Sequence, residues 1–532
     1  MTTTRTASAT KARAPAGKKS NRRSAEDKLI ELKQRLLEIS DLHSAGAVLS
    51  WDQATYMPDG GAAARGRQGA LLGRLAHERQ TDAKLGRLID ALAPHAARLD
   101  PASDATSLIR VARRDFEKAT KVPAEHVARA SALASASYDA WTRARPANDF
   151  ATMLPFLEQT LALSREYAGF FAPYEHIADP FIDDADEGMT TASVLTLFAE
   201  LRQALKPMVR AISDQPPVDD SCLRGAYAAK AQIDFGLSIA TRFGYDLARG
   251  RLDETHHPFC TRFAAGDIRI TTRVDEHNIG EALFSTLHEA GHAIYEQGVS
   301  AELDGTPLGH GTSAGVHESQ SRLWENVVGR SLGFWRHYFP LLQETFAGAF
   351  DGVALETFYR AINKVTPSLI RTDADEVTYN LHVMLRFDLE VAMLEGRLAV
   401  KDLPEAWRAA MQADLGVTPL DDRDGCLQDV HWFSGGIGGA FQSYTIGNIL
   451  GAQFHAAALA AYPDIPHEVE RGVFATLHAW LRDRIYRHGR KFAPSELVVQ
   501  ATGGPLSTTP YLAYLRGKYG EIYRLPAAEA AA

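Results

Sequence analysis

The stretch STLHEAGHAIYEQG (285–298) constrains the fold of this chain more than any other, because it places two histidines on an otherwise apolar segment. His288 and His292 stand four residues apart, and residues at this spacing lie about 5–6 Å apart on one face of a helix. Each imidazole can then direct a nitrogen at the same ion, as a tetrahedral zinc site requires. Glu289 follows His288 about 100° around such a helix, where it can reach a metal-bound water as a general base. A chance H-E-x-x-H, with a buried and hydrogen-bonded histidine pair, is the alternative interpretation.

The residues around this stretch predict where its helix begins and ends. The segment from Asn278 to Glu281 has the pattern of a capping box in its Asn form. Gly298 is placed to stop the helix as the residue that follows its last turn. The small Ala290 and Gly291 leave room for another group to approach. These flanks favour a metal site over a chance pair, but a third ligand is still required.

Helical periodicity dominates the rest of the chain from about residue 25. Leu29, Leu32 and Leu36 recur at intervals of three and four residues, with polar residues between them. The last helix is predicted to be opened by Thr509, with Pro510 at its first position. Further helices are predicted at 192–212, 375–396, 448–462 and 467–488.

One segment, GDIRITTRV (266–274), has the pattern of a strand instead. Ile268, Ile270 and Val274 alternate with polar residues, which gives one apolar face. The segment ends fourteen residues before His288. The predicted fold class is therefore mostly α, with a small β-sheet next to the helix that carries the two histidines.

Length and composition narrow the class of protein. At 532 residues the chain is too long for a single hydrophobic core, so more than one core or subdomain is expected. Hydrophobic residues make up 45% and charged residues 23%, as in ordinary globular proteins. The sequence contains no uninterrupted apolar run of membrane-spanning length, which predicts no membrane association. Three scattered cysteines fit a reducing compartment, and we expect a cytoplasmic protein.

The two ends of the chain differ from the rest. The first 28 residues hold eight Lys or Arg and two acidic residues, a net charge of +6, so the total of −9 leaves −15 for the remainder. We predict a disordered basic tail over 1–27, one catalytic domain over 28–525 and a disordered tail over 526–532. A transit peptide is the alternative for the N-terminal tail. The acidic body would repel phosphate, so nucleic-acid binding is not expected.

A third metal ligand must come from outside the histidine helix. The sequence after His292 lacks the further histidine of H-E-x-x-H-x-x-G-x-x-H. A carboxylate on the next helical segment, AGVHESQSRLWEN (314–326), is the remaining option. Glu318 is the candidate, and Glu325 is either a reserve ligand or a carboxylate that orients a histidine. For both glutamates the alternative is a solvated helix face.

Five motifs in order resemble one known family. They are HPF (257–259), HEAGH (288–292), HESQ (317–320), IRTDAD (370–375) and GCLQDVHW (425–432). Residues 49–68, LSWDQATYMPDGGAAARGRQ, are also similar to that family's N-terminal signature. The chain resembles the M32 (carboxypeptidase Taq) metallocarboxypeptidases over about residues 28–525.

The resemblance implies a fold, a site and an activity. The fold is expected to be a zincin-type helical fold with two helical subdomains flanking a deep central groove, akin to neurolysin and angiotensin-converting enzyme. The metal ligands are expected to be His288, His292 and Glu318, with Glu289 as the base. Members of the family release single amino acids from peptide C-termini with broad specificity. They are typically homodimers that use Zn²⁺ or Co²⁺.

An exopeptidase also needs a group that holds the free α-carboxylate of its substrate. A guanidinium does this with two parallel hydrogen bonds, and Arg371 is the candidate. Asp373 and Asp375 are expected to fix its geometry, and a purely structural ion pair between them and Arg371 is the alternative.

Three further residues are predicted to bind substrate. His257 belongs to the HPF motif, and Arg269 and Arg273 lie on the polar face of the 266–274 strand, where they can contact the carboxylate. The same strand can align a peptide by adding it to an edge.

The tetrahedral intermediate needs a hydrogen-bond donor besides the metal. His431 and Tyr444 are the candidates, with Asp429 orienting His431. A satisfied core histidine and a packing tyrosine are the alternatives. The family usually reads GYFP before the final Ser/Thr-Tyr pair, whereas Ala440 and Gln442 replace the tyrosine and proline here.

Together these features predict a metal-dependent carboxypeptidase acting on peptides with a free C-terminus. An oligoendopeptidase on the same scaffold is the nearest rival. A helical protein that has kept a metal site without catalysis is the rival from another class.

Overall fold

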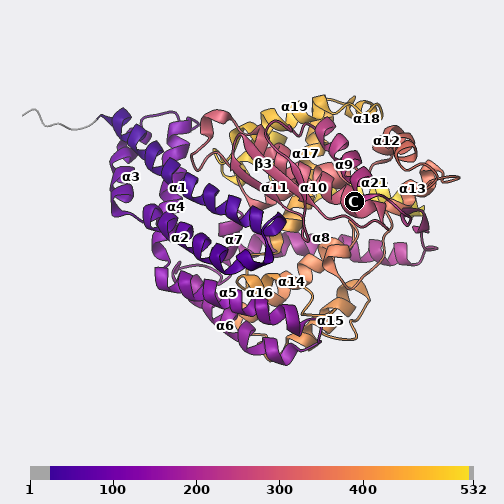
Figure 1. Cartoon of the computed structure of the whole chain (residues 1–532), viewed down its shortest axis with the longest axis horizontal. Coiled ribbons are helices and arrows are strands. Elements are labelled where there is room, and N and C mark those ends of the chain that lie inside the picture. Colours follow the sequence, from indigo (N-terminus) through magenta and orange to yellow (C-terminus); the bar gives the residue numbers. More distant parts are fainter. Residues whose placement is uncertain (1–23, 527–532) are drawn as a thin grey trace, which may run out of the picture.

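The computed structural model describes residues 24–526 and is mostly helical, with one small sheet (Figure 1). The predicted C-terminal tail and the first 23 residues of the predicted N-terminal tail lie outside the described residues, apart from residue 526. The boundary at residue 27 is wrong, because helix α1 begins at Ala25. Ser24 Oγ accepts a hydrogen bond from the backbone of Asp27, and Asp27 Oδ2 accepts one from the backbone of Ser24. This capping box starts the helix inside the basic segment.

From residue 24 to the sheet, the regular elements of the chain are helices. Its helices are α1 (Ala25–Thr55), α2 (Ala62–Gln80), α3 (Ala83–Ala96), α4 (Asp104–Lys121), α5 (Ala124–Ala144), α6 (Phe150–Gly169), α7 (Asp179–Ala185), α8 (Thr191–Ser213) and α9 (Ala229–Phe243).

The sheet and the helices that carry the candidate site follow. They are β1 (Leu252–Glu254), β2 (Cys260–Ala264), β3 (Asp267–Thr272), α10 (Ile279–Gly298), α11 (Ala314–Arg322) and the π-helical turn η4 (Leu323–Val328). The C-terminal part contains α12 (Leu332–Thr345), α13 (Leu355–Ile362), η5 (Arg371–Asp373), α14 (Tyr379–Glu395), α15 (Leu403–Leu415), α16 (His431–Ser434), α17 (Gln442–Ala461), α18 (Ile465–Val469), α19 (Ala475–Arg484), η7 (Tyr486–His488), α20 (Pro494–Thr502) and α21 (Thr509–Tyr523).

Most of the predicted helices are present, with shifted ends. The prediction for 192–212 is confirmed by α8, whereas α17 begins six residues before the predicted start at 448. The prediction of one helix over 467–488 is wrong, because Gly472 adopts a φ of +69° and separates α18 from α19. The N-cap of α21 is Thr508 and not Thr509, which is the first helical residue.

The strand prediction is confirmed over Asp267–Thr272, and Ile268 and Ile270 are fully buried as the alternation indicates. The strand order is β1-β3-β2, with β3 parallel to β1 and antiparallel to β2. Both edges of β3 are therefore occupied, and the prediction that a peptide adds to this strand is wrong. A substrate strand could pair only with an outer edge of β1 or β2.

Three hydrophobic cores form within the described residues, in line with the expectation from chain length. One is built by α5, α6, α8, α14, α15 and α21, a second by α9, α10, α12, α13 and the sheet, and a small third by α1, α3 and α4. Helix α17 belongs to both large cores, since Ile449 packs into the first and Ile446 into the second. In Figure 1, α10 and α11 lie at the centre, with α1–α4 on one side and α12 and α13 on the other.

Among residues 24–526, no helix combines the length and the apolar character that a membrane crossing needs.

Candidate active site

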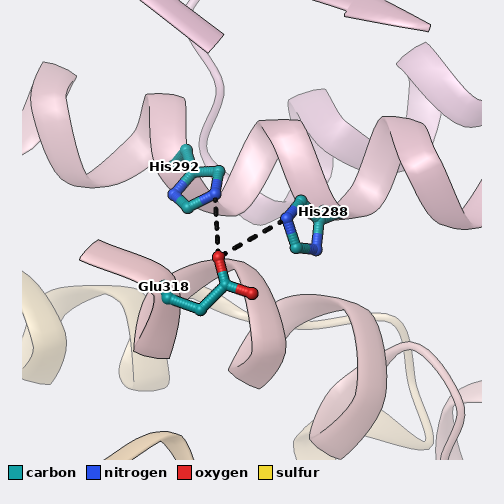
Figure 2. A group of neighbouring side chains, drawn as sticks. All are labelled: His288, His292 and Glu318. Carbon is teal, nitrogen blue, oxygen red and sulfur yellow. Dashed lines mark ion pairs between the residues drawn. The ribbon is translucent and has the colours of Figure 1, made fainter. Parts of the chain in front are cut away.

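Three side chains that could hold a metal ion meet between α10 and α11. His288 and His292 project from α10 toward α11, and one oxygen of Glu318 on α11 faces both imidazoles (Figure 2). Glu318 Oε2 lies 3.7 Å from His288 Nε2 and 3.4 Å from His292 Nε2. All three ligand atoms lie within 4.8 Å of one another. Two imidazoles and one carboxylate are a donor set that suits Zn²⁺ and leaves a position for water.

The predicted start of α10 at Asn278 is confirmed, but its capping box and its end differ from the prediction. Asn278 is the N-cap residue, and its side chain accepts a hydrogen bond from the backbone of Gly280 at 3.1 Å. The predicted capping box does not form, because the Glu281 carboxylate is paired with Arg273. Gly298 is the last helical residue and not the residue after it. A Cβ at Gly298 would lie 2.6 Å from Cβ of Tyr486, so a close contact and not a helix stop requires the glycine.

Glycines let the helices around the triad pack at short distance. A Cβ at Gly291 of α10 would lie 2.5 Å from the carbonyl oxygen of Gln320 in α11. A Cβ at Gly447 of α17 would lie 2.6 Å from Cβ of Glu318. Real Cβ atoms do not approach so closely, so α10, α11 and α17 could not hold this spacing with larger residues at these positions. The backbone approach brings the Glu318 carboxylate within reach of the α10 histidines.

Each histidine of the triad has a partner on its other nitrogen. His288 Nδ1 lies 2.9 Å from Glu325 Oε2, so Glu325 contacts the side of the imidazole that faces away from Glu318. His292 Nδ1 lies 2.6 Å from His317 Nδ1, and His317 Nε2 lies 2.9 Å from Glu296 Oε1. Partners of this kind fix the orientation of metal-binding imidazoles. The sequence reasoning missed His317 and Glu296, although both stand next to or one turn beyond a predicted ligand.

Burial dominates the electrostatics of the site. Burial raises the pKa of Glu289 to about 7, so this carboxyl gains or loses its proton near neutral pH. Burial also lowers the pKa of His292 to about 4, so its lone pairs are available for a ligand. For Glu318 burial acts in the opposite direction, but Arg322 and the two imidazoles outweigh it and hold its pKa far below the usual range. Glu318 is therefore ionised at any pH near neutrality.

Arg371 is the centre of a second buried cluster. Its Nε donates to Asp429 Oδ2 at 2.7 Å, and its Nη1 donates to the hydroxyl of Tyr379 at 3.0 Å. The predicted pairing with Asp373 and Asp375 is wrong: Asp373 is exposed, and Asp375 accepts hydrogen bonds from the backbone at the start of α14.

His431 and Tyr444 join the Arg371 cluster to the triad. His431 Nδ1 is hydrogen-bonded to Asp429, and its Nε2 lies 3.1 Å from the Tyr444 hydroxyl. The Arg371 guanidinium lies over the Tyr444 ring, 5.2 Å from its centroid. Tyr444 also lines the same cavity as His292 and Glu318. Of the two predicted oxyanion donors, Tyr444 therefore lines the cavity of the triad, and His431 contacts the Tyr444 hydroxyl.

The other candidates for substrate binding form no hydrogen bond or ion pair with the triad among the described residues. Partial desolvation and the positive charge of Arg371 lower the pKa of His257, whose loop therefore lies near the Arg371 cluster. Arg269 forms two hydrogen bonds with Asp267 and stacks over the Trp51 ring at 4.3 Å. Arg273 is held by Glu281, as described above. Nε and Nη2 of both arginines are engaged with neighbouring carboxylates, and contact of either residue with a substrate carboxylate stays a prediction.

A groove leads to the triad from the side of the N-terminal helices. Its volume is about 1140 Å³. Near the triad its walls are formed by His292, His317, Glu318 and Tyr444, and further out by residues of α1, α4, α7 and the segment 306–314. Ala440, which replaces the family's usual tyrosine, lines the groove next to Tyr444. Gln442 donates to the carbonyl oxygen of Gly439 at 3.0 Å and ties the glycine-rich loop to α17.

Comparison with known proteins agrees with this arrangement. Residues 31–519 match the family described as carboxypeptidase Taq (M32) metallopeptidase. Thermostable carboxypeptidase 1 of Thermus thermophilus is 43% identical over 496 residues, covering 91% of this chain and 97% of that protein. Carboxypeptidase 1 of Bacillus subtilis is 37% identical, covering 92% of this chain and 97% of that protein. The crystal structure of an M32 carboxypeptidase from Deinococcus radiodurans R1 superposes with a TM-score of 0.91 at 52% identity, covering 94% of this chain and all of that one.

A helical fold with an H-E-x-x-H helix and a carboxylate from the next helix defines a zincin-like metallopeptidase. This chain belongs to the M32 family of that class. It is therefore a peptide hydrolase of the metallocarboxypeptidase type, and the family implies a divalent metal. The expected zincin-type fold is confirmed by these structural neighbours.

Proposed function

We propose that the protein releases single amino acids from the C-termini of peptides, with broad specificity, using Zn²⁺ held by His288, His292 and Glu318. The observation that carries the proposal is the meeting of three ligand atoms from two helices within 4.8 Å. Co²⁺ is the expected substitute, because imidazole and carboxylate ligands suit both ions. When bound, the ion would polarise the scissile carbonyl and lower the pKa of a water molecule.

Glu289 is the proposed general base. Its carboxylate oxygen takes the proton of the attacking water and returns it to the nitrogen of the leaving amino acid. A base works best when its pKa lies near the working pH, and burial brings the pKa of Glu289 to about 7. Its neighbours His288 and His292 face Glu318 on one side and Glu325 or His317 on the other, which leaves Glu289 as the candidate proton acceptor beside the triad.

Arg371 is the proposed binding group for the terminal carboxylate of the substrate. Asp429 and Tyr379 hold its Nε and Nη1, and its Nη2 makes no hydrogen bond within the part of the chain that the structure describes. The buried guanidinium is thus fixed in place with a donor to spare, as recognition of a carboxylate requires. His431 Nε2 and the Tyr444 hydroxyl are the proposed donors to the developing oxyanion, since they contact each other and Tyr444 lines the cavity of the triad. His257, Arg269 and Arg273 are proposed as weaker contacts.

Replacement of Glu289 by Gln tests the mechanism. Metal content measured by mass spectrometry is expected to match the wild type, because the carboxylate does not belong to the triad. Release of free amino acids from mixed peptides is expected to fall by about 10²–10⁴-fold, the contribution of a positioned base. Glu302→Gln, an exposed glutamate just beyond α10, is the control and should keep full activity. Substantial turnover by Glu289→Gln would argue against this role.

A pair of peptides tests the exopeptidase assignment. A peptide with a free C-terminus should be cleaved, and its C-terminally amidated twin should be a poor substrate, because the amide offers Arg371 no charge. Equal cleavage of both peptides would indicate an oligoendopeptidase. No cleavage of either, in protein loaded with Zn²⁺ or Co²⁺, would indicate a metal-binding protein without catalysis.

Three further properties are proposed. The two large cores suggest two helical subdomains that flank the groove within one catalytic domain. The three cysteines, none of which forms a disulfide within the described residues, fit a cytoplasmic location. A homodimer is expected from the family, and light scattering on the purified chain would test it.

A further inference from the structure

Arg322 is a buried guanidinium that the proposed mechanism does not use. It is the last residue of α11, one helical turn after Glu318, and its side chain is 15% exposed. Its Nε donates to Glu318 Oε1 at 2.7 Å, and its Nη1 donates to Glu325 Oε2 at 3.3 Å. The guanidinium lies over the ring of Tyr379, 4.5 Å from its centroid. One cation therefore contacts both carboxylates that surround His288.

The two oxygens of Glu318 are used differently because of this contact. Oε1 is held by Arg322, whereas Oε2 faces His288 Nε2 and His292 Nε2. Among the described residues, the other hydrogen bond to Oε2 is a long one, 3.2 Å, from Ser321 Oγ. A carboxylate can bind a metal ion through one oxygen or through both. With Oε1 engaged, only Oε2 points into the space that the three ligands share.

The second contact of Arg322 acts on His288. Glu325 Oε2 accepts from Arg322 and also lies 2.9 Å from His288 Nδ1. The position of this oxygen, and with it the orientation of the imidazole, thus depends in part on the guanidinium. A flat, forked cation suits such a double contact better than the point charge of a lysine.

We propose that Arg322 is a positioning residue that restricts Glu318 to single-oxygen ligation of the metal and orients His288 through Glu325. The inference rests on the proposed metal-binding role of the triad and deepens it. Without Arg322, Glu318 would be free to turn Oε1 toward the ion or to move away from it.

Arg330 provides a matched control in the same region. Its Nη2 lies 3.4 Å from Glu325 Oε1, but its other donor goes to the carbonyl oxygen of Ile362, and it has no contact with Glu318. Its guanidinium lies over the ring of Phe284 at 3.6 Å. Arg330→Met therefore removes a partly buried cation near Glu325 while leaving the Arg322–Glu318 contact in place.

The test measures metal binding rather than turnover. Full-length wild type, Arg322→Met, Arg322→Lys and Arg330→Met are stripped with a chelator and titrated with Co²⁺ against a chromophoric competitor, and their visible spectra are recorded. Arg322→Met is expected to bind Co²⁺ about 10–100-fold more weakly. Its absorption should also weaken, as happens when a second carboxylate oxygen raises the coordination number of cobalt. Arg322→Lys should show a smaller change in the same direction, and Arg330→Met should stay within about threefold of the wild type.

The outcomes separate the inference from the proposed function. Circular dichroism of the stripped proteins shows whether each variant is folded, and Arg322→Lys carries the test if Arg322→Met is not. Wild-type affinity and spectrum in a folded Arg322 variant would overturn the inference, whatever its activity. If the wild type itself bound no Co²⁺ or released no amino acids, the proposed function would fail first.

Discussion

Glu390 predicts a dependence of stability on pH that one substitution should remove. This residue of α14 is 1% exposed, and its Oε1 accepts a hydrogen bond from Trp432 Nε1 at 2.8 Å. Its Oε2 is buried without a hydrogen-bond partner within the described residues. Burial raises the pKa of Glu390 from its usual 4.5 to about 8. The carboxyl is therefore neutral in the folded protein at pH 7, whereas the unfolded chain is ionised there.

The sign and the size of the effect follow from this difference. Between about pH 4.5 and pH 8 the unfolded chain has released a proton that the folded protein retains, so the stability falls as the pH rises through this window. Each pH unit corresponds to about 1.4 kcal/mol, and the window therefore costs on the order of 5 kcal/mol by pH 8. In a chain of this size, a loss of about 1 kcal/mol in the free energy of unfolding lowers the melting temperature by about 1 °C. The effect therefore amounts to roughly 5 °C.

Glu390→Gln replaces the carboxyl by an amide of the same shape that cannot ionise. Calorimetry of the wild type and the variant at pH 5, 6, 7 and 8 is expected to show a melting-temperature difference that grows in favour of the variant by roughly 3 °C between pH 5 and pH 8. Any constant cost of the amide nitrogen would shift the whole series without changing this slope. Glu158→Gln, an exposed glutamate on α6, should give a flat difference. A flat difference for Glu390→Gln as well would refute the reasoning.

Three further predictions concern the triad, the C-terminal helix and the metal. Gly447→Ala brings a Cβ within 2.6 Å of Glu318 and should cost about 1–3 kcal/mol of stability and weaken metal binding in a competition assay. Gly46→Ala in α1, with nothing within 4 Å, should leave metal binding unchanged and stabilise the protein by up to about 1 kcal/mol. Lys518→Met leaves the buried Glu376 without its cation, 2.8 Å away in the wild type, and urea unfolding should show a loss of about 3–5 kcal/mol. Dialysis against a chelator should abolish amino-acid release, and Zn²⁺ or Co²⁺ should restore it; activity that survives would count against metal dependence.

The parts of the site that depend on local spacing were predictable from the sequence. The four-residue spacing of His288 and His292 fixes their shared helix face, and period-two alternation identified the strand now seen as β3. The ends of α10 were less predictable, because Glu281 and Gly298 are claimed by tertiary contacts with Arg273 and Tyr486. From the sequence alone, Glu281 could cap the helix or form an ion pair, and Gly298 could end the helix or allow a close contact. Tertiary packing selected the second role in both cases.

The parts that depend on distant residues were not predictable in the same way. The carboxylate partner of Arg371 was sought among its neighbours Asp373 and Asp375, but it is Asp429, which lies 58 residues away in the sequence. The position of β3 in the middle of the sheet depends on β1, a strand of only three residues that carries no clear pattern. Contacts between elements decide such features, and a single sequence records them only indirectly.

The glycine contacts among α10, α11 and α17 bear on which ion the protein carries. Backbone packing brings Gly291 against α11 and Gly447 against Glu318, so the helices themselves set the spacing of the three ligands. Little of the binding energy of a metal ion is then needed to order the chain. A site formed in this way accepts whichever ion of suitable size and preference is most abundant around it. The metal ion bound at the site would then depend on which ions are available in the cell as much as on the protein.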